Sequence, residues 1–163
     1  MKIDIALREA HAAETALAAG LLRAGERHAA EHDVAHLSRT LSRWCDRHVQ
    51  RLAEQGERYD VDLEAGSVRD EEDRGLVARA RERGAELVGR RPEPGILLLR
   101  DLRDVHLAAA RASIAWIVLG QGAQAVFDDE LLAAVTASHP ETIRTLQWTV
   151  QKLKEASPQV LAS

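Results

Sequence analysis

Cysteine, methionine and proline are scarce in this chain of 163 residues, which contains one, one and four of them, respectively. The single cysteine, Cys45, excludes an internal disulfide and is typical of a reducing compartment, so we expect a cytoplasmic protein. Because the only methionine is Met1, a haem could not take an internal methionine as its axial ligand. Glycine and proline are few before residue 65, and strand signals are nearly absent. The sequence therefore predicts an all-α fold of long helices.

The chain also lacks a long apolar run and a strong excess of either charge. Its longest apolar run, IAWIVLG at 114–120, is far shorter than the ~20 residues that a membrane helix needs. The first ten residues place Asp4, Arg8 and Glu9 where a signal peptide requires apolar residues. With 22 basic and 26 acidic residues, the formal charge is −4, which gives no general reason to bind nucleic acid or an acidic membrane. We therefore expect neither partner.

The length fits one domain, 1–163, and apolar residues recur at steps of three and four along four stretches. This spacing predicts four amphipathic helices. The first spans about 3–28 and the second about 34–57. Between them, at AAEHD, the apolar residues shift by one position relative to the spacing of the first stretch. This shift indicates a turn with Asp33 as the cap of the second helix, although one long helix remains possible.

The third predicted helix begins after Pro94 and ends near GQGAQA, and the fourth begins near Asp128. Pro140 should kink or restart the fourth helix, which is expected to stop before Pro158. Nearly forty residues separate the second and third helices, and 70–91 reads as a helix of ~20 residues, or ~30 Å. Such a connection can travel the length of a bundle, so it predicts a long helical crossover.

Each of the four predicted helices carries a metal-capable side chain on its apolar face: Glu14, His48, His106 and His139. Glu14 occupies a position where the spacing asks for an apolar residue, and burying a carboxylate without a partner costs several kcal/mol. His11 lies three residues before Glu14, and Cys45 lies one turn before His48. One such histidine is more often structural, but a set spread over four helices predicts a metal site inside the bundle.

Positions along the helices indicate which of these side chains can meet. In an antiparallel pair, Glu14 and His48 would lie within ~2 Å of the same level at 1.5 Å per residue. If the third helix runs parallel to the second, His139 joins that level and His106 lies ~10 Å away. The predicted ligands are therefore Glu14, His48 and His139, with three further candidates, His11, Cys45 and His106.

The fragments EHDVAHL, LLLRDLRDVH, LGQGAQA and SPQVL resemble a group of small bacterial proteins within the ferritin-like superfamily. In that superfamily, inward carboxylates and Glu-x-x-His motifs of a four-helix bundle hold a di-metal centre. The resemblance implies a ferritin-like four-helix bundle with a long helical crossover between its second and third helices. It also implies that Glu14 matches the first-helix carboxylate and that His48 matches the histidine of the second-helix motif.

The candidate ligands depart from that pattern in ways that favour one metal ion over two. Cys45 stands where the glutamate of the second-helix motif should be, and His106 replaces a third-helix carboxylate. The fourth helix has His139 followed by Pro140 and Glu141 rather than Glu-x-x-His. Imidazoles with one carboxylate and a thiolate are typical of a transition metal such as iron or zinc. We therefore predict a mononuclear site for redox or storage-type chemistry; whether the protein is an enzyme stays open.

The alternative is a metal-free bundle whose polar residues bond to one another and which acts as an oligomeric interaction module. Trp148 lies almost opposite the stripe of the fourth helix, and the third helix is apolar nearly all round near SIAWIVLG. Both features would expose apolar surface to water unless another surface packs against it, so we expect a homodimer through the third and fourth helices.

A second metal site is conceivable at the first turn, where His28, His32 and His36 lie close together in sequence. Histidines near a helix end also interact favourably with its carbonyl groups. The sequence leaves both interpretations open.

Overall fold

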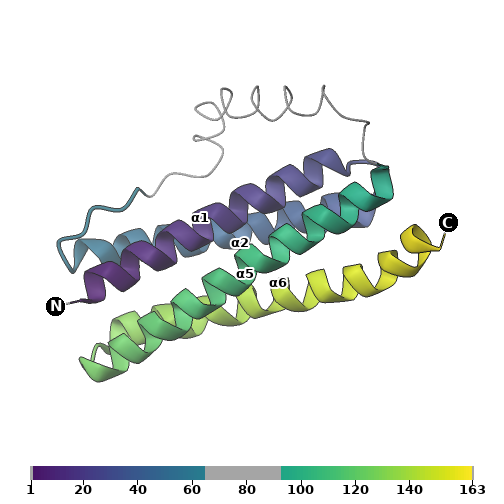
Figure 1. Ribbon diagram of the computed structural model, residues 1–163. Coiled ribbons are helices and arrows are strands. Elements are labelled where there is room, and N and C mark those ends of the chain that lie inside the picture. Colours follow the sequence, from purple (N-terminus) through teal and green to yellow (C-terminus); the bar gives the residue numbers. More distant parts are fainter. Residues whose placement is uncertain (1, 65–92, 163) are drawn as a thin grey trace.

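Four long helices make up most of the computed structural model, which describes residues 2–64 and 93–162. They are α1 (Ile3–Arg27), α2 (His32–Glu57), α5 (Pro94–Ala125) and α6 (Asp129–Leu161). No strand occurs within these two ranges, which confirms the predicted all-α, four-helix architecture. The pair α1–α2 packs against the pair α5–α6 (Figure 1). None of the described helices combines the length and apolar character needed to cross a membrane.

Contacts near the helix ends define the directions of the helices. Gly25, near the end of α1, packs closely against Ser38 in the first half of α2. Arg27, at the end of α1, forms a 2.9 Å ion pair with Asp101 near the start of α5. Helix α1 is therefore antiparallel to both neighbours, so α2 and α5 run in the same direction. A crossover requires this arrangement, but the expected crossover helix, 70–91, lies outside the described residues.

The predicted turn between the first two helices is present, but α2 begins earlier than expected. The helix starts at His32, so Asp33 lies in the first turn rather than at the cap position. There its carboxylate accepts a 2.9 Å hydrogen bond from the backbone N–H of Val34 and pairs with Lys152 of α6. A negative charge in the first turn of a helix is favourable, because the exposed N–H groups give this end a partial positive charge.

Asp128 caps α6 and ties its start to the end of α2. One carboxylate oxygen accepts a 3.0 Å hydrogen bond from the backbone N–H of Leu131, and the other accepts a 2.6 Å bond from the Tyr59 hydroxyl. Burial raises the pKa of Asp128, but these donors and the guanidinium of Arg58 outweigh it and lower the pKa to about 2. The cap is therefore ionised at neutral pH, which strengthens its bonds.

Helix α6 continues through both of its prolines, whereas the sequence predicts a kink or restart at Pro140 and a stop before Pro158. A proline inside a helix removes one hydrogen bond to the carbonyl group four residues earlier. Here those carbonyls belong to Thr136 and Lys154, and all four residues are exposed. Water can solvate the unbonded carbonyls, so the helix tolerates both prolines.

The inward face of α6 is lined mainly by hydroxyl groups. Its buried residues are Leu131, Val135, Ser138, Thr142, Thr145 and Thr149. The sequence pattern instead predicts an inward stripe of Leu132, Val135, His139, Ile143, Leu146, Val150 and Leu153. Of this stripe, only Val135 is buried. Threonine can face the interior because its hydroxyl can bond to a backbone carbonyl one turn earlier, as Thr145 does to that of Glu141.

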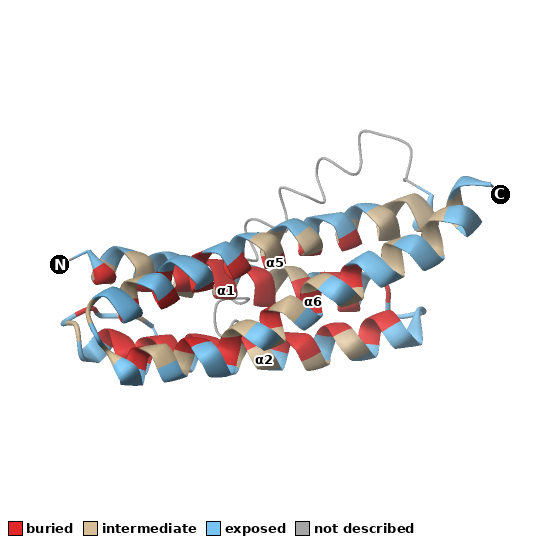
Figure 2. Cartoon of the chain, turned by 90° about the horizontal axis from the view of Figure 1, so that it is seen from below, coloured by how far each residue is buried: buried red, intermediate tan, exposed pale blue. Residues whose placement is uncertain are grey.

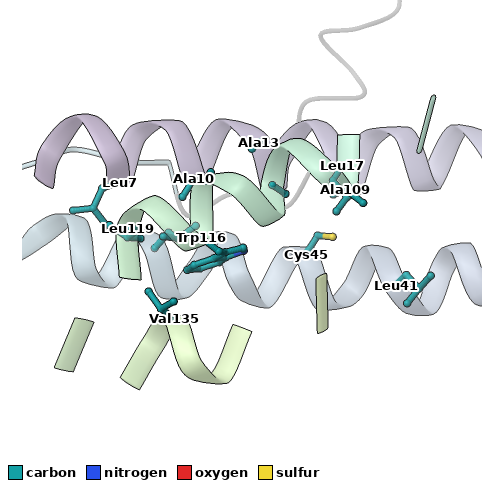
Figure 3. Close-up of a cluster of buried hydrophobic side chains, with 14 of the residues drawn as sticks. Leu7, Ala10, Ala13, Leu17, Leu41, Cys45, Ala109, Trp116, Leu119 and Val135 are labelled. Carbon is teal, nitrogen blue, oxygen red and sulfur yellow. The ribbon is translucent and has the colours of Figure 1, made fainter. Parts of the chain in front are cut away.

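Buried residues occur along all four helices (Figure 2). Most of the apolar side chains of the core cluster belong to α1 and α5, and the close-up shows several of them together (Figure 3). Helices α2 and α6 contact one another partly through polar side chains, which we call the polar seam. Its contacts are those of His48 with Glu141, Arg51 with Ser138 and Gln55 with Glu130. Trp116 of α5 is the largest fully buried side chain and lies amid the apolar cluster (Figure 3). The packing of α1 with α5 is therefore mainly apolar, whereas α2 and α6 meet partly through polar contacts.

Candidate metal centre

Glu14 lies near the middle of α1 with its carboxylate fully buried, as its stripe position predicts. One oxygen, Oε1, accepts a 2.6 Å hydrogen bond from the indole N–H of Trp116 and a 2.8 Å bond from the hydroxyl of Thr142. These donors come from α5 and α6, so three helices meet at this carboxylate. A buried tryptophan on a helix stripe needs an acceptor for its N–H, and this requirement is the signal that could have identified Trp116 from the sequence.

His48 of α2 is buried between two carboxylates. Its Nδ1 lies 3.1 Å from Oε2 of Glu14, and its Nε2 lies 2.8 Å from Oε2 of Glu141 on α6. The edge of the ring also meets Trp116, with the centroids 5.8 Å apart. Burial raises the pKa of Glu14, but the adjacent imidazole of His48 and the hydrogen bonds from Trp116 and Thr142 outweigh it and hold the pKa below its usual value. Glu14 is therefore ionised at neutral pH.

Cys45 completes a cluster of three metal-capable side chains with Glu14 and His48. One ligand atom from each residue lies within 4.8 Å of the other two, and all three residues are buried. The Cys45 side chain lies among the apolar residues of the core (Figure 3). Burial, together with the adjacent Glu14 carboxylate, raises the pKa of Cys45 well above its usual value. In the absence of an ion, this side chain is a neutral thiol at physiological pH.

The contact between Glu14 and His48 is close but poorly directed. Although Oε2 and Nδ1 are only 3.1 Å apart, the angle does not allow a hydrogen bond, and neither atom has another such partner within residues 2–64 and 93–162. Buried polar atoms without aligned partners are uncommon. Two atoms that bind the same ion lie close together without a hydrogen bond between them, because both direct their lone pairs at the ion.

His139, which the sequence places with Glu14 and His48, is not part of the cluster. It is half-buried on the α5 side of α6, where its Nε2 lies 2.9 Å from the hydroxyl of Ser113. Burial lowers the pKa of His139, and the nearby charge of Glu14 offsets only part of this effect. The third ligand atom of the cluster belongs to Cys45 instead, because the inward face of α6 is rotated away from the predicted stripe.

The other two candidates also have separate partners. His106, which the sequence places at a different level, has its Nδ1 2.9 Å from the hydroxyl of Thr149. His11 has its Nε2 2.8 Å from the backbone carbonyl of Glu64. Neither histidine contributes to the cluster of Glu14, Cys45 and His48.

The histidines of the first turn do not form a second cluster. His28 is buried, and its Nε2 lies 2.7 Å from a carboxylate oxygen of Asp101 on α5, whereas His32 and His36 are exposed. Among the described residues, the central cluster is the only group of three or more metal-capable side chains found. The structure therefore favours the structural interpretation of this turn.

Comparison of the chain with models of known families, with curated proteins and with solved structures finds no significant match. The functional interpretation therefore rests on the geometry of the cluster and on the sequence.

Proposed function

We propose that the protein binds one transition-metal ion through Glu14, Cys45 and His48. The observation that carries this proposal is the pair of buried atoms, Oε2 of Glu14 and Nδ1 of His48, which lie 3.1 Å apart without an aligned hydrogen bond. With the sulfur of Cys45 nearby, these atoms provide one oxygen, one nitrogen and one sulfur donor around a common point. An ion at that point would give both unaligned atoms a partner.

The chemistry of the donors narrows the choice of ion. A thiolate and an imidazole favour zinc, iron or a similar transition metal over magnesium or calcium, which prefer oxygen ligands alone. Three protein ligands leave a coordination position open, so the bound ion could supply Lewis-acid or redox chemistry there. Glu14 would contribute a negative charge that Trp116 and Thr142 hold in place. This arrangement supports the redox or storage-type role expected from the sequence.

The proposed fold type is a ferritin-like bundle with a crossover between α2 and α5. The parallel direction of these two helices supports it, as does an inward first-helix carboxylate facing an inward second-helix histidine. The cluster differs from the di-metal pattern, because Cys45 replaces a carboxylate and neither His106 nor His139 joins it. We therefore propose a ferritin-like scaffold with a mononuclear site.

Titration of untagged, metal-free protein with Co²⁺ tests the proposed site. We expect one equivalent to bind and to produce the sulfur-to-cobalt charge-transfer absorption of a thiolate ligand. Cys45→Ala should abolish this absorption and weaken binding more than about 100-fold, beyond the 10–100-fold typical of groups that only orient a ligand. Ser42→Ala is the matched control, because this buried α2 hydroxyl bonds only to the carbonyl of Arg39. Wild-type protein without stoichiometric binding would refute the proposal.

A second candidate function, homodimerisation, is favoured by an exposed apolar surface on α5. Ile114, Ile117 and Val118 are 63%, 50% and 50% exposed, and their spacing places them next to one another on one outward face of the helix. Contiguous apolar surface of this kind marks interaction sites. We propose that a second copy of the chain covers this face. Trp148, which the sequence also assigns to such an interface, is half-buried and packs against the core.

Ile114→Glu is expected to convert a dimer into monomers, because a carboxylate at the centre of an apolar interface would be buried without a partner. Sedimentation velocity should show association weakened by more than about tenfold, which corresponds to 1.4 kcal/mol. Ile5→Glu is the control, since Ile5 is similarly exposed but lies on α1. A wild-type chain that remains monomeric at high concentration would contradict the prediction.

A further inference from the structure

Glu141 joins the candidate metal centre to the protein surface. Its Oε2 lies 2.8 Å from Nε2 of His48, and both carboxylate oxygens accept hydrogen bonds from Nη2 of Arg47, at 3.1 and 3.3 Å. The Glu141 side chain is 21% exposed, whereas His48 is almost fully buried. A chain of polar contacts therefore runs from Glu14 through His48 to Glu141 and ends at a solvent-exposed guanidinium.

The two carboxylates contact different nitrogen atoms of the same imidazole ring. Glu14 lies beside Nδ1, and Glu141 lies beside Nε2. The contact at Nε2 has the geometry of a hydrogen bond, whereas the contact at Nδ1 does not. A carboxylate can only accept a hydrogen bond, so the proton of a neutral His48 belongs on Nε2. The lone pair of Nδ1 is then free on the side that faces Glu14 and Cys45.

We propose that Glu141 is a positioning residue for the metal centre, an inference that rests on the proposed function. It fixes the proton of His48 on Nε2, holds the ring in the orientation that directs Nδ1 at the ion, and increases the basicity of the ligand. Carboxylates bonded to the second nitrogen of a metal-bound histidine act in this way in many proteins. Arg47 holds the carboxylate of Glu141 in place through its two hydrogen bonds.

The position of Glu141 argues against a direct ligand role. While its carboxylate is bonded to Nε2, the imidazole ring separates it from Nδ1 and from the cluster formed with Cys45. Its neighbour Thr142 instead points to Glu14, to which it donates a hydrogen bond. Two successive residues of α6 therefore hold two proposed ligands, Glu141 acting on His48 and Thr142 on Glu14.

Glu141→Gln tests this role, because it keeps the size of the side chain and removes the charge. We expect Co²⁺ to bind 10–100-fold more weakly than to wild type. The thiolate absorption at saturation should be unchanged, since Cys45 still binds. In zinc-loaded protein, the imidazole N–H proton of His48 should be visible by NMR in wild type and exchange much faster in the variant. Glu130→Gln is the matched control, because Glu130 also lies on α6 but contacts Gln55 and Arg58.

The outcomes separate this inference from the proposed function. Wild-type protein that binds no cobalt would overturn the metal site and, with it, the role of Glu141. Wild-type binding with unchanged affinity and N–H exchange in Glu141→Gln would overturn the role of Glu141 alone. If Glu141→Gln lowers the helix content, Arg47→Ala provides the second test. It leaves the contact between Glu141 and His48 intact, so we expect a smaller loss of affinity in the same direction.

Discussion

Replacing Glu14 with leucine is expected to lower the free energy of unfolding of the metal-free protein by about 3–5 kcal/mol. The leucine side chain fits the volume, but it leaves the indole N–H of Trp116 and the hydroxyl of Thr142 without their acceptor. It also leaves His48 with one carboxylate instead of two. Each buried donor without a partner costs about 1–3 kcal/mol, so the loss of hydrogen bonding outweighs the gain in apolar burial. Urea unfolding followed by circular dichroism in the presence of a chelator measures this difference.

Trp116→Phe provides the internal control for this prediction. Alone it removes the donor of a 2.6 Å hydrogen bond to a buried carboxylate, which should cost about 1.5–3 kcal/mol. Combined with Glu14→Leu it removes a donor that already lacks its acceptor, so the double variant should be more stable than the sum of the single effects by about 1–2 kcal/mol. Additive effects, or a Glu14→Leu variant as stable as wild type, would contradict the described hydrogen-bond network.

Metal affinity is expected to rise by at least about tenfold for each pH unit between pH 6 and pH 8, or about 100-fold in total. Burial and the Glu14 carboxylate raise the pKa of Cys45 well above its usual value, so the free protein carries a protonated thiol throughout this range. A bound transition metal holds the thiolate, and binding therefore releases the proton. Because the pKa of Glu14 is lowered, its carboxyl group is already ionised and contributes no further dependence.

Competition titrations with a chelator at several pH values, in buffers that do not bind metal, measure this dependence. Cys45→Ala is the control, because a site without the thiol has no such proton to release. For each pH unit, the affinity of the remaining weak binding should therefore rise about tenfold less than the affinity of the wild type. An affinity in the wild type that does not change with pH would show that Cys45 is not a ligand.

The central pairing could be predicted from the sequence because it depends on two robust quantities, helix period and rise per residue. A carboxylate on an apolar stripe requires a partner, and the antiparallel arrangement of the first two helices brings His48 to the level of Glu14. Cys45 follows from the same reasoning, since it lies one turn from His48 on the same face. Whether these residues hold a metal stays a prediction.

The sequence could not predict which face of α6 points inward. Hydropathy periodicity counts a hydroxyl group as polar and takes no account of the hydrogen bonds that allow it to be buried. Thr142 and Thr145 count as polar in such a pattern, yet both are buried through hydrogen bonds to Glu14 and to a backbone carbonyl. The apolar stripe of the same helix is mostly half-buried. The resulting rotation places His139 at Ser113 and brings Glu141 to His48. The sequence therefore does not assign Glu141 to the site, since a carboxylate next to an exposed proline has the pattern of an ordinary surface residue.

Because of the polar seam, separating α2 from α6 should cost less free energy than separating α1 from α5. The close packing of α1 with α5 removes apolar surface from water, which contributes about 25 cal/mol per Å². The polar groups of the seam gain far less on leaving water, because they exchange one set of hydrogen bonds for another. Separation of α6 from α2 should therefore be the least costly local fluctuation that exposes Glu14, Cys45 and His48. An ion could then enter or leave while the apolar half of the molecule stays folded.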